Sequence, residues 1–264
     1  MIYPAKTYNF LTRRLSRAML TMIWLTIGLA IFSLVVSIIG GIAAINSGDE
    51  DTILAFMSFT FIVSGIVSIL EIIFFIIYFV RLYDFRNNVE GKDRSNSSLL
   101  ITAIWIQIAT PILSTLLIVI AITSSNFSFA GINDTDDLVD ALEWFLEDVG
   151  PMIAVAGIVS LLGSLVAFVL QLIGYAGLGK SQTLYRYTAD GFKSVFMSYI
   201  WLIIGFGVYF LMLILGAATE LPAFLAIGVL ALFVICIVSL VKLIKGWNLV
   251  GVPAPVEADP LSIS

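Results

Sequence analysis

The chain has 264 residues, of which 60% are hydrophobic and 12% are charged, and its mean hydropathy is +1.09. This composition lies far outside the range of soluble globular domains and indicates a multi-pass membrane protein. The formal net charge is −5, and the sequence contains no histidine. The commonest general base and the commonest metal ligand are therefore both missing, which excludes Ser-His-Asp and Cys-His catalytic triads.

The sequence also lacks the other short motifs that carry chemistry. Its single cysteine, Cys236, lies within an apolar run, which excludes an intrachain disulfide and a CxxC pair. It has no Walker A loop, no Gly-x-Gly-x-x-Gly after a strand, and no basic patch with interleaved aromatic residues. We therefore expect a protein that is not an enzyme, with no catalytic residue, no cofactor, no metal and no nucleic-acid partner.

The first apolar run covers 18–45 and is too long to be the core of a signal peptide, so we expect a retained transmembrane helix. Residues 1–17 are predicted to form a cytoplasmic segment, either a short interfacial helix or a solvated lead-in. Ser33, Ser37 and Gly41 recur at helical spacing, and such a ridge of small residues favours close packing of another helix.

The second apolar run, 53–80, contains one acidic residue, Glu71, well inside it. An ionised carboxylate near the middle of a bilayer costs about 3 kcal/mol on insertion scales, so we expect Glu71 to face protein or water, or to be protonated. Helical spacing places further polar residues on the face of Glu71. They are Thr60, Ser64, Ser68 and Tyr78.

The third apolar run, 99–123, contains Gln107 and Pro111. A proline inside a helix removes the hydrogen bond to the carbonyl four residues back, which here belongs to Gln107. Thr110 and Ser114 lie on the same helical face. This pattern is typical of interrupted helices that form binding sites in membranes, but it also fits a simple kink stabilised by a neighbouring hydroxyl.

The stretch 124–150 is the one long loop, and it is strongly acidic. Within it, apolar residues recur at helical spacing and aspartates come first, so we predict an amphipathic helix over 136–149 that lies on the external membrane surface. The residues predicted to be buried there are Leu138, Leu142 and Phe145. A solvated acidic face is a better interpretation than a calcium site, because no EF-hand loop is present.

Three more apolar runs follow, and a polar tail closes the chain. The runs cover 151–177, 195–218 and 223–244, and the predicted transmembrane domain therefore spans 18–248. The fourth run carries Gln171 and a second small-residue ridge of Ala156, Ser160 and Ser164. The fifth and sixth runs are joined by a short turn and should form a hairpin. Residues 249–264, with three prolines, are predicted to be a disordered cytoplasmic tail.

Basic residues indicate the orientation of the chain. All 13 lysines and arginines lie before the first run, between the second and third, between the fourth and fifth, or at the end of the sixth. The positive-inside rule then places both termini in the cytoplasm and the acidic loop outside. We therefore expect six transmembrane helices in a cell membrane.

An Ile-Trp pair recurs near the cytoplasmic side of the odd-numbered helices, at 23–24, 104–105 and 200–201. This recurrence favours three tandem copies of one helical hairpin within an all-α membrane bundle. Chance is the alternative, because apolar segments use few residue types and tryptophan favours the membrane interface.

Two functions fit these patterns. Glu71, Gln107 and Gln171 lie about 12 to 15 Å from the cytoplasmic ends of their helices, so together with Ser68 and Tyr78 they could line a polar site for transport or permeation of a small solute, ion or proton. The alternative is a structural or accessory subunit that forms homo- or hetero-oligomers in the lipid bilayer through its small-residue helix faces.

The topology can be tested with reporters fused after Ser264 and within 124–150. We expect a reporter that is active only in the cytoplasm to be active after Ser264 and inactive within 124–150. A reporter that is active only outside the cell should show the opposite pattern, because the basic residues lie on one side. An external C-terminus would contradict the six-helix assignment.

Overall fold

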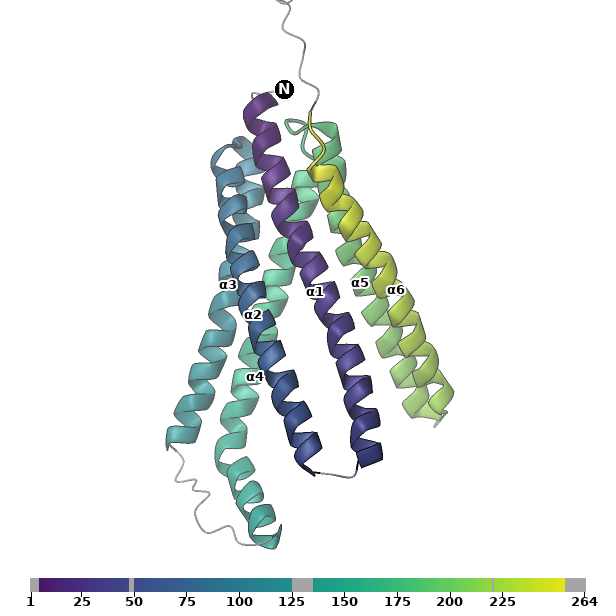
Figure 1. The fold of residues 1–264 in the computed structure, drawn as a ribbon. Coiled ribbons are helices and arrows are strands. Elements are labelled where there is room, and N and C mark those ends of the chain that lie inside the picture. Colours follow the sequence, from purple (N-terminus) through teal and green to yellow (C-terminus); the bar gives the residue numbers. More distant parts are fainter. Residues whose placement is uncertain (1–4, 48–49, 125–134, 220, 255–264) are drawn as a thin grey trace, which may run out of the picture. The chain divides into compact units, whose positions relative to one another are not determined.

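The computed structural model describes residues 5–47, 50–124, 135–219 and 221–254 (Figure 1). These residues form helices and no strands. Within the helices, most side chains between 43 and 68 and between 135 and 148 lie outside the described part of the structure. The helices are α1 (Ala5–Ser47), α2 (Glu50–Asn87), α3 (Gly91–Ser124), α4 (Thr135–Gly179), α5 (Arg186–Thr219) and α6 (Pro222–Val250).

Five stretches of the described residues are long and apolar enough to cross a membrane. They are Thr7–Gly40, Gly91–Ser124, Val149–Gly179, Arg186–Thr219 and Ala223–Val250. The apolar run of α2 falls largely on residues whose side chains are not described, so the sixth span stays a prediction. The all-α, membrane-compatible character of the chain is thus confirmed, whereas the count of six spans and the tandem hairpins are not.

Helices α1 and α6 reach into the segments expected to flank the transmembrane domain. Helix α1 begins at Ala5 and runs without interruption into the apolar segment. Tyr8 and Leu15 are buried in this first part of α1. At the other end α6 continues to Val250, inside the segment predicted to be a tail, and the remaining tail residues 255–264 lie outside the described part.

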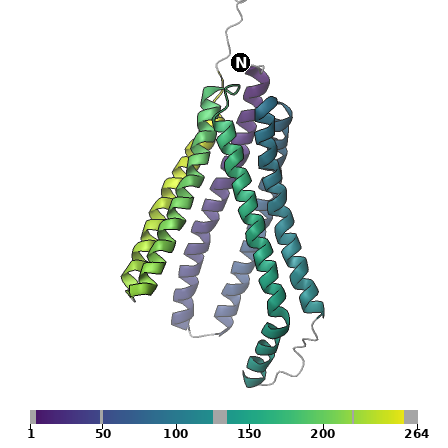
Figure 2. The ribbon, with the colours of Figure 1, turned by 180° about the vertical axis from the view of Figure 1, so that it is seen from behind.

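Residues 136–149 are helical, as predicted, but they are the first part of α4 and continue directly into its apolar segment. Pro151 lies inside this helix and cannot donate a hydrogen bond to the carbonyl four residues back. The first part of α4 bends away from the rest of the helix in both views (Figures 1 and 2). The side chains of Leu138, Leu142 and Phe145 lie outside the described residues, so their burial at the membrane surface stays a prediction.

The chain divides into two compact units, which are described separately. The first unit contains Met1–Ser97 and Tyr175–Ser264, and the second contains Ser98–Gly174. The first unit thus holds α1, α2, α5 and α6 together with the beginning of α3 and the end of α4. The second unit holds most of α3 and α4.

Helices α5 and α6 lie side by side in the first unit (Figure 1). Their backbones approach closely at two glycines, because a Cβ on Gly191 would lie 2.7 Å from the carbonyl oxygen of Gly246. Hydroxyl groups add hydrogen bonds to backbone carbonyls: Ser194 donates to Lys242 at 2.9 Å, and Ser239 donates to the carbonyl of Ser198 at 2.8 Å. Small residues and hydroxyls at a helix interface are the usual means of association in membranes.

An aromatic cluster lies at the end of the first unit where α6 finishes. Trp247 is fully buried, and its ring meets the rings of Tyr78, Tyr175 and Phe192 at centroid distances of 5.9, 6.3 and 6.0 Å. The interplanar angles of 82° to 89° are those of edge-to-face pairs, which are favoured by the quadrupoles of the rings. Tyr199 stacks on Tyr175 at 5.6 Å. The cluster therefore joins α2, α4, α5 and α6.

Helix α1 is fastened to the same end of the first unit. Ser16 donates a hydrogen bond to the carbonyl oxygen of Trp247 at 2.5 Å. The side chain of Asn9 makes two hydrogen bonds to the backbone of Ala254, at 3.1 and 2.6 Å. Tyr8 packs against Tyr185 with the ring centroids 4.9 Å apart.

In the second unit, α3 and α4 run beside each other (Figure 2). Ser114 donates a hydrogen bond to the carbonyl oxygen of Ala156 at 3.1 Å, and Ala156 is buried. Gly163, two turns after Ala156 on α4, lies against Thr110, one turn before Ser114 on α3, so closely that a Cβ would overlap the threonine side chain. The predicted small-residue ridge of α4 therefore contacts α3 through Ala156, with Gly163 rather than Ser164 at the next contact.

The glycine contact between α5 and α6 predicts a difference between two otherwise similar substitutions. Gly191→Ala would place a methyl group against the backbone of α6, and overpacking of this kind costs about 1 to 3 kcal/mol. A Cβ at Gly207, on the same helix, would have no atom within 4 Å. Gly207→Ala should therefore gain helix propensity, because alanine is favoured over glycine in a helix by up to about 1 kcal/mol. We expect the melting temperature of the purified protein in detergent to fall for Gly191→Ala and to stay equal or rise for Gly207→Ala. Equal melting temperatures for the two variants would argue against a tight α5–α6 contact.

Candidate functional site

Glu71 lies on α2 and is half-buried. Its Oε1 atom is 3.2 Å from the hydroxyl of Thr26 on α1, within hydrogen-bonding distance. The same hydroxyl is also 3.1 Å from the backbone carbonyl of Met22. Because a hydroxyl has one proton to donate, Thr26 cannot satisfy both acceptors fully. An ionised Glu71 is thus only weakly supported by α1, whereas a protonated Glu71 could donate to Thr26.

A hollow of about 500 Å³ lies beside this pair. Its walls are Met22, Thr26, Glu71, Ile72 and Phe75, so the carboxyl and the threonine hydroxyl are the polar side-chain groups that it reaches. Ile72 is 58% exposed, which shows that the hollow opens onto the outer face of the α1–α2 pair. The acid thus lies at the edge of the helix pair, in a mostly apolar surrounding.

The structure brings together some of the polar residues singled out in the sequence. In the second unit, Gln171 on α4 donates a hydrogen bond from Nε2 to Oε1 of Gln107 on α3, at 3.3 Å. Tyr78 is buried in the aromatic cluster of the first unit, with its hydroxyl 3.2 Å from that of Tyr175. The side chain of Ser68 lies outside the described residues. The two glutamines therefore bond to each other, Glu71 bonds to Thr26, and Tyr78 has a separate packing role.

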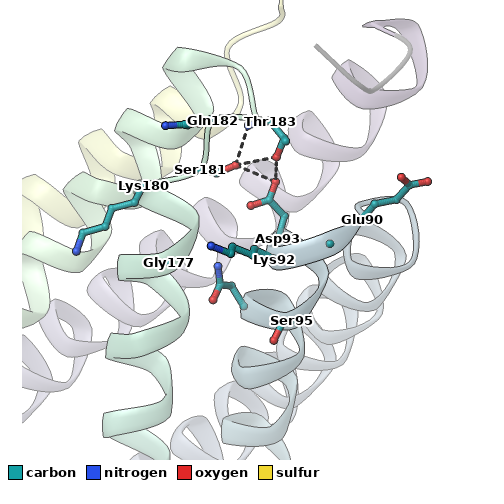
Figure 3. A pocket seen from close by; sticks show the side chains of 11 residues that line it. Glu90, Lys92, Asp93, Ser95, Gly177, Lys180, Ser181, Gln182 and Thr183 are labelled. Atoms are coloured by element: carbon teal, nitrogen blue, oxygen red, sulfur yellow. Dashed lines mark hydrogen bonds between the residues drawn. The ribbon is translucent and has the colours of Figure 1, made fainter.

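A pocket of the first unit lies at the end of the helices, where the α2–α3 turn meets the α4–α5 turn (Figure 3). We call it the polar end pocket, and its volume is about 710 Å³. Charged and polar residues predominate in its wall. They are Glu90, Gly91, Lys92, Asp93, Ser95, Asn96, Gly177, Lys180, Ser181, Gln182 and Thr183.

A buried carboxylate organises this pocket. Asp93, in the first turn of α3, is 3% exposed, and its Oδ2 atom accepts hydrogen bonds from the hydroxyls of Ser181, at 2.8 Å, and Thr183. The hydroxyl oxygen of Ser181 in turn accepts hydrogen bonds from the backbone N–H groups of Thr183 and Leu184, both at 3.2 Å. Asp93 therefore fixes the α4–α5 turn against the start of α3 (Figure 3).

Two glycines make this arrangement possible. Gly91 has a φ of +56°, a left-handed conformation that most other residues adopt only with strain, and it allows the sharp entry into α3. Gly177, near the end of α4, lies directly against the side chain of Asn96, so closely that a Cβ would overlap the asparagine amide. The end of α4 and the start of α3 thus approach each other within the first unit.

The polar end pocket and the aromatic cluster were not predicted from the sequence. Lys92 and Lys180 served there only to indicate the orientation of the chain, although an aspartate in the first turn of a helix and the nearby Ser-Gln-Thr run are signals for a clamp. Trp247 was given no role, although Gly246 before it indicates a close helix contact.

Comparison of the chain with protein-family models, with curated proteins and with solved structures finds no match.

The Asp93 clamp can be tested by proteolysis. Asp93→Ala removes two hydrogen bonds to a carboxylate, each worth about 1.5 kcal/mol or more, so local opening of the α4–α5 turn should rise about 100-fold. We expect trypsin to cleave the protein in detergent after Lys180 correspondingly faster, as measured by mass spectrometry of the fragments.

Asp190→Ala is the matched control for this experiment. Asp190 forms only an exposed ion pair with Arg186 at 3.8 Å, and such pairs contribute about 0 to 1 kcal/mol. Its cleavage rate after Lys180 should stay within about fivefold of the wild-type rate. Equal rates for the two variants would rule out the clamp.

Proposed function

We propose that the protein is a non-enzymatic, multi-pass integral membrane protein that acts as a structural or accessory subunit. In this proposal both termini are cytoplasmic, and the face of α1 and α2 around Glu71 packs against a helix of another membrane protein. The observation that supports this proposal concerns Glu71, in the apolar part of α2. Among the described residues, its carboxyl is hydrogen-bonded only by Thr26, which it shares with the carbonyl of Met22.

The depth of Glu71 makes that pairing important. Glu71 lies ten residues before Arg81, which places it about 15 Å from the end of the apolar run of α2 and hence near the middle of a hydrocarbon core of about 30 Å. A charge there costs about 2.5 to 3.5 kcal/mol on insertion scales, whereas a hydrogen bond between membrane helices contributes about 0.6 kcal/mol on average. The bond to Thr26 therefore offsets only a small part of the cost of an ionised carboxylate. A polar group from a partner helix, placed in the hollow beside Glu71, would offset a further part of this cost.

Other polar groups of the membrane segments support the same interpretation. Gln107 bonds to Gln171, and Ser114 and Ser239 each donate to a carbonyl of the neighbouring helix. These groups are used for contacts between helices, which is the role expected of them in a bundle that serves packing.

Transport is the second candidate, and one observation favours it. The hollow of about 500 Å³ reaches the carboxyl of Glu71, and a partly exposed carboxyl in a membrane is a common carrier of protons or cations. In that case a proton or cation would reach the Glu71 carboxyl from the hollow, beside the hydroxyl of Thr26.

Substitutions of Glu71 separate the two functions. Glu71→Gln keeps the shape and the hydrogen-bonding capacity of the side chain but removes the titrating group, whereas Glu71→Leu removes both. For a subunit, we expect complexes extracted with mild detergent from native membranes to exceed the 28.8 kDa of one chain for the wild type and Glu71→Gln, and to dissociate for Glu71→Leu. Thr115→Leu, at an exposed polar position of α3, is the control and should leave the complexes intact.

Flux measurements complete the test. Neither the wild type nor Glu71→Gln should carry a pH-dependent or cation-dependent flux in reconstituted vesicles. A flux in the wild type that is lost in Glu71→Gln would overturn the subunit proposal in favour of transport.

A further inference from the structure

We propose that the polar end pocket binds a phosphate group, and that the phosphate is supplied by the headgroup of an anionic phospholipid. This site is separate from Glu71 and does not depend on the function proposed above. Three properties of the pocket carry the inference: its cationic groups, its rigid wall and its depth in the membrane.

The cationic groups of the pocket are Lys92 and Lys180. Among the described residues, neither ammonium group forms an ion pair. Lys92 extends across the pocket toward Gly177, and the carboxylate of Glu90 points away from both lysines (Figure 3). The other acid in the wall, Asp93, already accepts the hydroxyls of Ser181 and Thr183. The Lys92 ammonium is therefore available to an anion in the pocket, and Lys180, whose side chain extends away from Lys92 in Figure 3, adds positive charge at the rim.

Neutral donors lie in the same wall. Ser95 has a hydroxyl, and Asn96 and Gln182 have side-chain amides, all of which can donate hydrogen bonds to phosphate oxygens. A phosphate has several acceptor oxygens and can accept from ammonium and neutral donors at the same time. The volume of about 710 Å³ lies in the range of pockets that hold a small-molecule ligand.

The pocket is formed before any ligand binds. The Asp93 clamp fixes the turn that carries Lys180 and Gln182, and the contact between Gly177 and Asn96 fixes the opposite wall. Binding to a fixed wall costs less conformational entropy than binding to a flexible basic loop. This rigidity distinguishes the pocket from the general excess of basic residues at this end of the helices.

The depth of the pocket indicates a lipid as the source of the phosphate. Asn96 lies three residues, or about 4.5 Å, before the apolar run that starts at Leu99, and Lys92 lies seven residues, or about 10 Å, before it. The headgroup layer outside the hydrocarbon core is about 5 to 8 Å thick on each side. The pocket therefore opens at the level of the phosphates, and lysine side chains reach that level readily.

The experiment uses the full-length protein in nanodiscs of phosphatidylcholine with increasing fractions of phosphatidylglycerol. Binding of phosphatidylglycerol is measured by native mass spectrometry and by its retention during lipid exchange. In a polybasic segment, each lysine near a membrane surface strengthens binding of anionic lipid about fivefold. We expect the double variant Lys92→Gln/Lys180→Gln to bind phosphatidylglycerol about 25-fold more weakly than the wild type.

Two further variants control for charge and folding. Lys193→Gln/Lys245→Gln removes the same charge from exposed positions on α5 and α6 outside the pocket, and it should keep wild-type binding. Lys92→Arg/Lys180→Arg keeps the charge in the pocket and should also keep binding. The folding of Lys92→Gln/Lys180→Gln is checked by proteolysis. If trypsin cleaves this variant after Lys193 and Arg186 at the wild-type rate, the variant is folded.

Inorganic phosphate identifies the source of the ligand. If millimolar phosphate does not displace phosphatidylglycerol, the site is a headgroup site as proposed. The other outcome is that inorganic phosphate binds in the absence of anionic lipid and that this binding is lost in Lys92→Gln/Lys180→Gln. In that case the pocket binds phosphate, but the proposal that a lipid supplies it is wrong. Equal losses in the pocket variant and the surface variant, or no preference for phosphatidylglycerol over phosphatidylcholine, would overturn the proposal.

Discussion

Trp247 is the residue on which the first unit depends. Its fully buried ring contacts aromatic rings from α2, α4 and α5 edge to face, and its backbone carbonyl accepts the hydroxyl of Ser16 from α1. One residue near the end of the chain thus contacts every long helix of the unit. Aromatic pairs of this kind contribute about 0.5 to 1.5 kcal/mol each beyond the area that they bury. The ends of these helices are therefore tied to one another through a single residue.

The location of this cluster has a physical reason. In the apolar middle of a membrane, lipid solvates leucine and isoleucine as well as protein does, so burial there provides little driving force. At the helix ends water is present, and burying aromatic surface is favourable again. Many of the buried residues of the first unit accordingly lie at this end, such as Leu82 and Phe85 on α2 and Phe192 on α5. The Asp93 clamp and the polar end pocket lie at this same end of the first unit, which gives them a rigid support.

Hydropathy predicted the helices well, because long apolar runs have few alternatives in a bilayer. It could not predict where the helices end: α1 and α6 extend past their apolar runs because polar and aromatic residues pack there, as Tyr8 and Trp247 do. Equal depth on their helices is compatible with the contact between Gln107 and Gln171, but the sequence did not predict that these two residues bond to each other. The contact of Asp93 with Ser181 and Thr183 was not predicted either, because it joins two turns far apart in the sequence, and no periodicity indicates which turns meet.

The clasp between Asn9 and Ala254 has a consequence for biosynthesis. These residues are separated by 245 positions, so the two hydrogen bonds can form only when nearly the whole chain has been made. At about 5 to 20 residues per second, the ribosome needs about 12 to 50 s to synthesise that interval. During this time the residues that bind Asn9 and Ser16 do not yet exist. The contacts that hold the N-terminal part of α1 to the end of the chain therefore form only when synthesis is nearly complete.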